Sequence, residues 1–148
     1  MQRCVLVILM AGLLAGADSS TQAETKTDQD GIQGTWQGVS AEKQGQKAPE
    51  ERVKAIQMII SADRFIFKRD DQTHVARYRI DPTRNPKQID VIPADGSGKG
   101  KTSVGIYKLE GDTLTLCTSP PGEPRPTEFA SGPKSRESLI VLRREKPR

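Results

Sequence analysis

The chain has 148 residues, a typical length for one domain with a sizeable core. Hydrophobic residues make up 34% and aromatic residues 4%, so we expect a thin core with some disordered sequence outside it. The formal net charge is +4, but basic and acidic residues are interspersed and no stripe of basic and aromatic residues occurs, so no nucleic-acid partner is expected.

Residues 1–17 have the pattern of a secretory signal peptide. Arg3 supplies a positive start, an apolar run covers 4–14, and the small residues 15–17 (AGA) form a cleavage site. The apolar run is too short to cross a hydrocarbon core of roughly 30 Å, so we expect no stable membrane insertion after cleavage. The pattern therefore predicts an exported protein of the periplasm or the extracellular space.

A polar linker is expected next, because residues 18–30 have no hydrophobic periodicity and read as disordered. The folded domain is then expected to span residues 31–146. Its first strand is predicted over 32–42, which contains the only Trp, Trp36. A Pro, two acidic residues and then basic residues over 47–54 predict one short helix, which is expected to plug one end of the fold.

Seven further strands are predicted where apolar and polar residues alternate between short connections. They cover 56–61, 64–69, 73–80, 88–92, 104–109, 113–117 and 138–144. A ninth, weaker candidate covers 127–129. The short connections imply antiparallel neighbours. Eight such strands with one apolar face avoid exposed edges by closing, so the predicted fold is all-β, a small antiparallel up-and-down β-barrel.

Catalytic and metal-binding motifs are weak in this sequence. His74 is the only histidine, which excludes a histidine-rich metal site and leaves a Ser-His-acid triad unsupported. The stretch 96–102 (GSGKGKT) mimics a phosphate-binding loop, but a strand pattern follows it instead of a helix. Cys117 ends an alternating strand, where a thiol is more often a small buried hydrophobe than a nucleophile. We expect no cofactor, no metal and no catalytic residue, and an enzyme is the least favoured class.

Five separated segments share a pattern with a known family. They are GTW at 34–36, YRIDPTRNPKQIDV at 78–91, GIYKLEGDTLTLC at 105–117, RPTEFAS at 125–131 and VLRRE at 141–145. Together they resemble a lipocalin-like exported domain of unknown function that recurs in planctomycete bacteria. The resemblance implies a small lipocalin-type barrel and supplies no activity. It also implies that Trp36 packs at the closed end under Arg143 or Arg144, where a cation over the indole contributes about 0.5 to 2 kcal/mol.

Two functions fit such a barrel. The first is a binding module that holds a small apolar ligand or a protein partner at its mouth. The second is a structural or interaction domain with a filled barrel and no ligand, because barrels of about eight strands can be of either kind. The proline-rich stretch 120–126 is expected to be a stiff rim loop, with extended-peptide recognition as the alternative. The candidate ligand-binding residues are the aromatic side chains expected to converge on the interior, which are Trp36, Phe65, Phe67, Tyr78 and Tyr107.

Overall fold

The structure, a computed structural model, describes residues 28–146. The predicted signal peptide (1–17) and residues 18–27 of the predicted linker lie outside the described residues. Residues 28–31 form a helical turn, and the elements that follow are β1 (Gly34–Lys43), β2 (Gln46–Lys47), α2 (Glu50–Lys54), β3 (Ile56–Ile60), β4 (Arg64–Arg69), β5 (Gln72–Asp81), β6 (Lys87–Pro93), β7 (Ser103–Glu110), β8 (Thr113–Thr118) and β9 (Ser138–Arg144).

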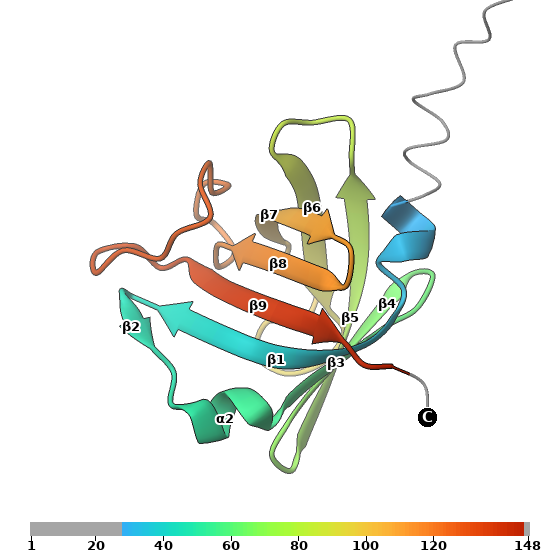
Figure 1. The fold of residues 1–148 in the computed structure, drawn as a ribbon. Coiled ribbons are helices and arrows are strands. Elements are labelled where there is room, and N and C mark those ends of the chain that lie inside the picture. Colours follow the sequence, from blue (N-terminus) through green and yellow to red (C-terminus); the bar gives the residue numbers. More distant parts are fainter. Residues whose placement is uncertain (1–27, 147–148) are drawn as a thin grey trace, which may run out of the picture.

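Eight of these strands close into an antiparallel barrel (Figure 1). The sheet order is β2-β1-β3-β4-β5-β6-β7-β8-β9, and β9 pairs back onto β1. That closing register runs from Trp36 opposite Arg144 to Lys43 opposite Ser138, with an irregularity between Gly38 and Ser40. Closure leaves the eight strands without an open edge, which confirms the predicted all-β antiparallel barrel.

Two details differ from the sequence-based expectations. The weak strand candidate at 127–129 is a bend, because prolines at 124 and 126 remove the amide donors that strand pairing needs. The ninth strand is instead β2, which forms a short hairpin with the end of β1. The predicted helix is present but begins only at Glu50, because residues 46 and 47 belong to that hairpin.

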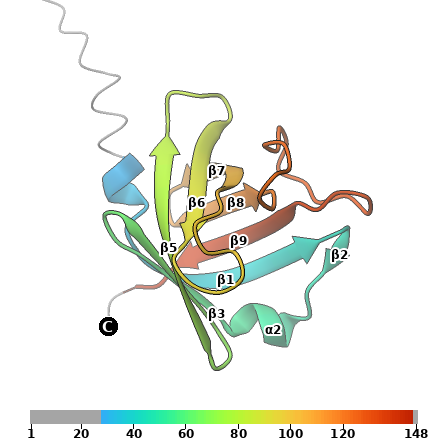
Figure 2. The ribbon, with the colours of Figure 1, turned by 180° about the vertical axis from the view of Figure 1, so that it is seen from behind.

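The two helical pieces lie at opposite ends of the barrel (Figures 1 and 2). The turn at 28–31 lies beside the start of β1 and the end of β9, whereas α2 lies near β2 at the far end of β1. Its buried residue is Val53, and its Arg52 borders the interior cavity described below. We therefore refer to the end at 28–31 as the closed end and to the other as the mouth.

Side-chain size changes along the inward faces of three neighbouring strands. Near the closed end, β5, β6 and β7 bury Tyr78, Ile89 and Tyr107. Two residues nearer the mouth, the same inward faces carry Ala76, Val91 and Gly105, because strand side chains repeat on one face every second residue. A Cβ at Gly105 would lie 2.6 Å from the Cys117 carbonyl oxygen, so this position tolerates no larger residue without a shift of β8. The interior is therefore filled at one end and open at the other.

Candidate functional site

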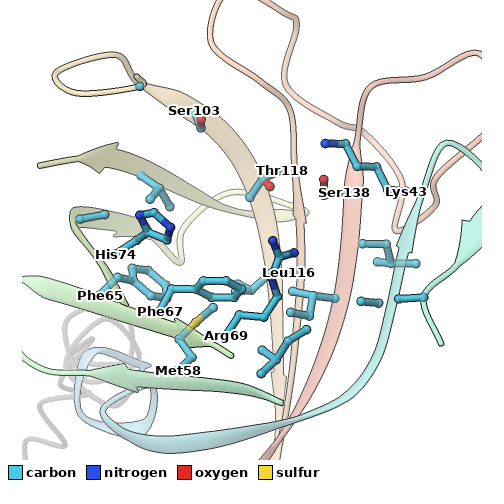
Figure 3. Close-up of a pocket in the computed structure, with 18 of the residues that line it drawn as sticks. Lys43, Met58, Phe65, Phe67, Arg69, His74, Ser103, Leu116, Thr118 and Ser138 are labelled. Atoms are coloured by element: carbon cyan, nitrogen blue, oxygen red, sulfur yellow. The ribbon is translucent and has the colours of Figure 1, made fainter. Parts of the chain in front are cut away.

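A cavity of about 830 Å³ occupies the mouth half of the barrel (Figure 3). Small-molecule sites typically have roughly 300 to 1,000 Å³, so this volume suits one ligand of moderate size. The small side chains on β5 and β6 account for part of the space, because Ala76 and Val91 both line the cavity.

The floor of the cavity is apolar. Met58 from β3, Phe65 and Phe67 from β4, and Leu116 from β8 line it. Phe65 is held from below by Tyr78, whose ring meets it edge to face with 4.9 Å between the ring centroids. Edge-to-face pairs of this kind contribute about 0.5 to 1.5 kcal/mol beyond simple burial, so this part of the floor is held in place by packing.

The rim of the cavity is polar. Hydroxyl side chains border it on three adjacent strands, with Ser103 on β7, Thr118 on β8 and Ser138 on β9. On the β5 side, His74 Nδ1 lies 3.4 Å from an Asp95 carboxylate oxygen, and the other oxygen of that carboxylate accepts the backbone N–H of residue 75 at 3.2 Å. The lining also contains four cationic side chains, which are Lys43, Lys47, Arg52 and Arg69.

The five aromatic residues predicted to face a ligand fall into two groups. Phe65 and Phe67 line the cavity. Trp36, Tyr78 and Tyr107 are buried in the core cluster and are not among the lining residues. They belong to the packed part of the interior, and of the three Tyr78 contacts the floor residue Phe65.

Trp36 is fully buried at the closed end, with 0% of its surface exposed. Its indole Nε1 donates a hydrogen bond to the carbonyl oxygen of Ile32 at 2.9 Å. The guanidinium of Arg144 lies over the indole, 4.3 Å from the ring centroid, and donates to the carbonyl oxygens of Gln33, at 2.7 Å, and Gly31. Arg143, the other candidate from the last strand, is exposed. One side chain of β9 therefore ties together β1 and the segment that precedes it.

A second polar cluster anchors the helical turn to the barrel wall. The Tyr107 hydroxyl donates to a carboxylate oxygen of Asp28 at 2.6 Å, and Lys87 Nζ lies 2.9 Å from the same oxygen. Burial, followed by the neighbouring Asp28 carboxylate, raises the pKa of Tyr107. Asp28 belongs to the stretch that the sequence predicts as a linker, and no periodic pattern there indicates that its carboxylate is buried. Its partners, Lys87 and Tyr107, lie far away in the sequence, so only the fold reveals the contact.

The remaining residues considered for catalysis or metal binding lie in surroundings that suit a structural role. The Cys117 thiol is buried and donates to the carbonyl oxygen of Ala130 at 3.5 Å. Burial raises its pKa, so the reactive thiolate is disfavoured. Across residues 28–146, no three His, Cys, Asp or Glu side chains are grouped in a way that could hold a metal ion. The same part of the chain contains no helix with the length and hydropathy needed to cross a membrane.

The fold and the cavity together define the class of this protein, a small closed antiparallel barrel with an apolar interior pocket at one end. This architecture is compatible with a lipocalin-like fold. Comparisons with protein-family models, with curated proteins and with solved structures found no match to the chain.

Proposed function

We propose that this protein is a binding module that holds a small apolar ligand inside the mouth half of its barrel. The observation that carries the proposal is the cavity of about 830 Å³ above an apolar floor. Apolar surface removed from water contributes roughly 25 cal/mol per Å², so a floor of Met58, Phe65, Phe67 and Leu116 favours an apolar group.

The barrel wall also favours binding because it is preformed. The strands that carry the floor, β3, β4 and β8, are each hydrogen-bonded to a neighbour on both sides. A ligand that enters such a site orders few additional groups, and so more of its contact energy is available as affinity.

The test is a titration with an apolar fluorescent probe, monitored through the emission of the probe itself, because Trp36 lies away from the cavity. We expect saturable binding to the unmodified protein. Ala76→Phe places a large ring in the cavity and is expected to weaken binding at least about tenfold, which corresponds to 1.4 kcal/mol. Ala76→Leu is a milder second variant and is expected to show a smaller loss.

The matched control is Thr73→Phe. Thr73 lies on the same strand but is exposed and, by alternation, on the outer face, so the same ring added there should leave binding unchanged. Circular dichroism of each variant establishes that the barrel is retained. If no lipid or aromatic probe in a broad panel binds saturably, the function is better sought in a structural or interaction role of the outer surface and rim loops.

We further propose that the protein is exported, as the pattern over residues 1–17 indicates, and that it is related to the lipocalin-like exported domains of planctomycete bacteria that it resembles. Intact-mass measurement on the protein expressed in a bacterial host is expected to give a chain that begins at Asp18. A cytoplasmic protein that retains Met1 would contradict the proposed location.

A further inference from the structure

We propose that the ligand of this barrel is an amphipathic anion, with an apolar body on the cavity floor and a negatively charged head group at the mouth. This inference rests on the proposed binding function and adds the chemical class of the ligand. It arises from the unequal charge of the cavity lining, which contains two carboxylates (Glu42 and Asp95) and four cationic side chains (Lys43, Lys47, Arg52 and Arg69).

Arg69 is the most informative of these cations, because its strand position turns it inward. Phe65, Phe67 and Arg69 alternate along β4 and therefore share one face, and the first two of them form the cavity floor. Figure 3 shows the Arg69 side chain extending into the cavity beside Phe67 and Leu116. A head group at the end of an apolar chain on this floor would meet the guanidinium directly.

The mouth cations come from several elements on one side of the opening, the side formed by β1 to β4 and α2. Lys43 lies at the end of β1, Lys47 in β2 and Arg52 in α2, while Arg69 lies at the end of β4, which β3 separates from β1. Such an arrangement concentrates positive charge on one side of the opening, and its attraction for an anion is stronger where the cavity wall partly excludes water.

The cavity lining contains two carboxylates, Glu42 and Asp95, that could neutralise these cations. Among the described residues, none of the four forms an ion pair, although other cations of the same region do, such as Lys54 with Glu50 at 3.0 Å. Asp95 is already engaged by His74 and by a backbone N–H. An anionic ligand would therefore supply the charge that the described part of the chain does not place there.

The hydroxyl groups at the rim suit the same head group. Ser103, Thr118 and Ser138 border the cavity, and in the sheet Ser138 is paired with both Lys43 and Thr118. Hydroxyl and guanidinium donors together satisfy the acceptor positions of an anionic oxygen group, and hydrogen bonds to a charged acceptor are about twice as strong as neutral ones.

The test compares two probes that differ only in the head group, dansylaminoundecanoic acid and its methyl ester. We expect the acid to bind the unmodified protein about tenfold more tightly than the ester, the ratio typical of one charge-assisted hydrogen-bonding contact. Arg69→Gln is expected to remove most of this difference by weakening the acid while leaving the ester unchanged. Lys43→Gln is expected to act in the same direction.

Lys68→Gln is the matched control, because it removes the same charge from the neighbouring, outward-facing position of β4. It should leave the affinity of both probes unchanged. Equal binding of acid and ester would overturn the anion site and leave the binding module standing, whereas saturable binding of neither probe would overturn the proposed function itself. Equal effects of Arg69→Gln and Lys68→Gln would show that the acid is attracted by the overall charge of the protein, which would overturn the assigned head-group site. Equal weakening of both probes by Arg69→Gln would overturn it as well, because the ester carries no charge.

Discussion

Arg144 makes two kinds of contact at the closed end that reinforce one another. Its guanidinium covers the face of Trp36 and at the same time donates to the carbonyl oxygens of Gly31 and Gln33. The hydrogen bonds hold the planar guanidinium over the indole, and the indole shields those hydrogen bonds from water. A Lys in this position would keep the charge and lose the planar, forked geometry.

Trp36→Ala is expected to lower the free energy of unfolding by about 3 to 5 kcal/mol, the usual range for deleting a buried aromatic side chain. The change would leave a cavity beneath Arg144 and remove the hydrogen bond to Ile32. Denaturant unfolding followed by circular dichroism measures this, because the variant lacks the only Trp. A loss of less than about 1 kcal/mol would show that the packing at the closed end is not as described.

The two tyrosines of the chain, Tyr78 and Tyr107, are expected to resist ionisation while the protein is folded. Burial is the main cause that raises the pKa of each above its usual value of 10.0. In the unfolded chain both ionise near that value. Above about pH 10 the folded state therefore holds more protons than the unfolded state, and the free energy of unfolding falls as pH rises.

Tyrosinate absorbance measured against pH checks this prediction. The denatured protein should titrate near pH 10, and the tyrosines of the folded protein should titrate at higher pH. A reversible titration near pH 10 in a chain that remains folded would contradict the burial of the two tyrosines and their hydrogen bonds from Tyr78 to Ser61 and from Tyr107 to Asp28.

At the scale of elements, the helical turn at 28–31 is too short to be stable alone, so its position depends on contacts with the barrel. Those contacts include Ile32, which directly follows the turn and is fully buried, and Asp28, which bonds to β6 and β7 through Lys87 and Tyr107. Gln29 and Gly31 also hydrogen-bond to the barrel. The turn therefore closes the barrel end through an apolar anchor and several polar ones.

Asp28→Ala is expected to destabilise the fold by about 1 to 3 kcal/mol, because it leaves the buried Tyr107 hydroxyl without its acceptor. In a Tyr107→Phe background the same substitution should cost less, since the orphaned hydroxyl is then absent. The double-mutant cycle, measured by denaturant unfolding, isolates this coupling. Strictly additive effects would mean that the two side chains do not interact.

At the scale of the whole molecule, the pairing of β9 with β1 turns a sheet into a barrel. β9 is paired with β8 on one side and with β1 on the other, so its backbone amides face partner strands on both sides. Without this closure, β1 and β8 would each present an open edge, and the cavity would have no continuous wall.

Val141→Pro is expected to destabilise the barrel by about 3 kcal/mol or more, because it removes a strand amide and distorts a strand paired on both sides. Val141→Ala is the matched control and should cost less than about 1 kcal/mol. By alternation the side chain of Val141 lies on the outer face of β9, because its neighbour Leu142 faces inward. Thermal unfolding of both variants gives the comparison. Similar losses in the two variants would mean that the side chain of Val141, and not its backbone, carries the closure.

Much of the fold was predictable because it depends on local patterns. Alternation of apolar and polar residues identified the eight barrel strands, and short connections such as the one between β7 and β8 implied antiparallel pairing. Two of the five predicted aromatic residues, Phe65 and Phe67, also lie on the cavity because alternation determines which residues share a face. The short strand β2 carried no such signal, since two residues cannot show a period.

The tertiary structure alone decided where the barrel is filled and where it is open. Alternation shows that Tyr78 and Ala76 both face inward, but their depth depends on how the strands are staggered around the barrel. The same holds for Asp28, which reads as linker until the fold brings Tyr107 to it, and for Arg69, whose neighbours across the mouth come from distant parts of the chain. A periodic sequence determines the face of a residue, whereas long-range strand register determines its depth, and in this protein depth separates the packed closed end from the cavity.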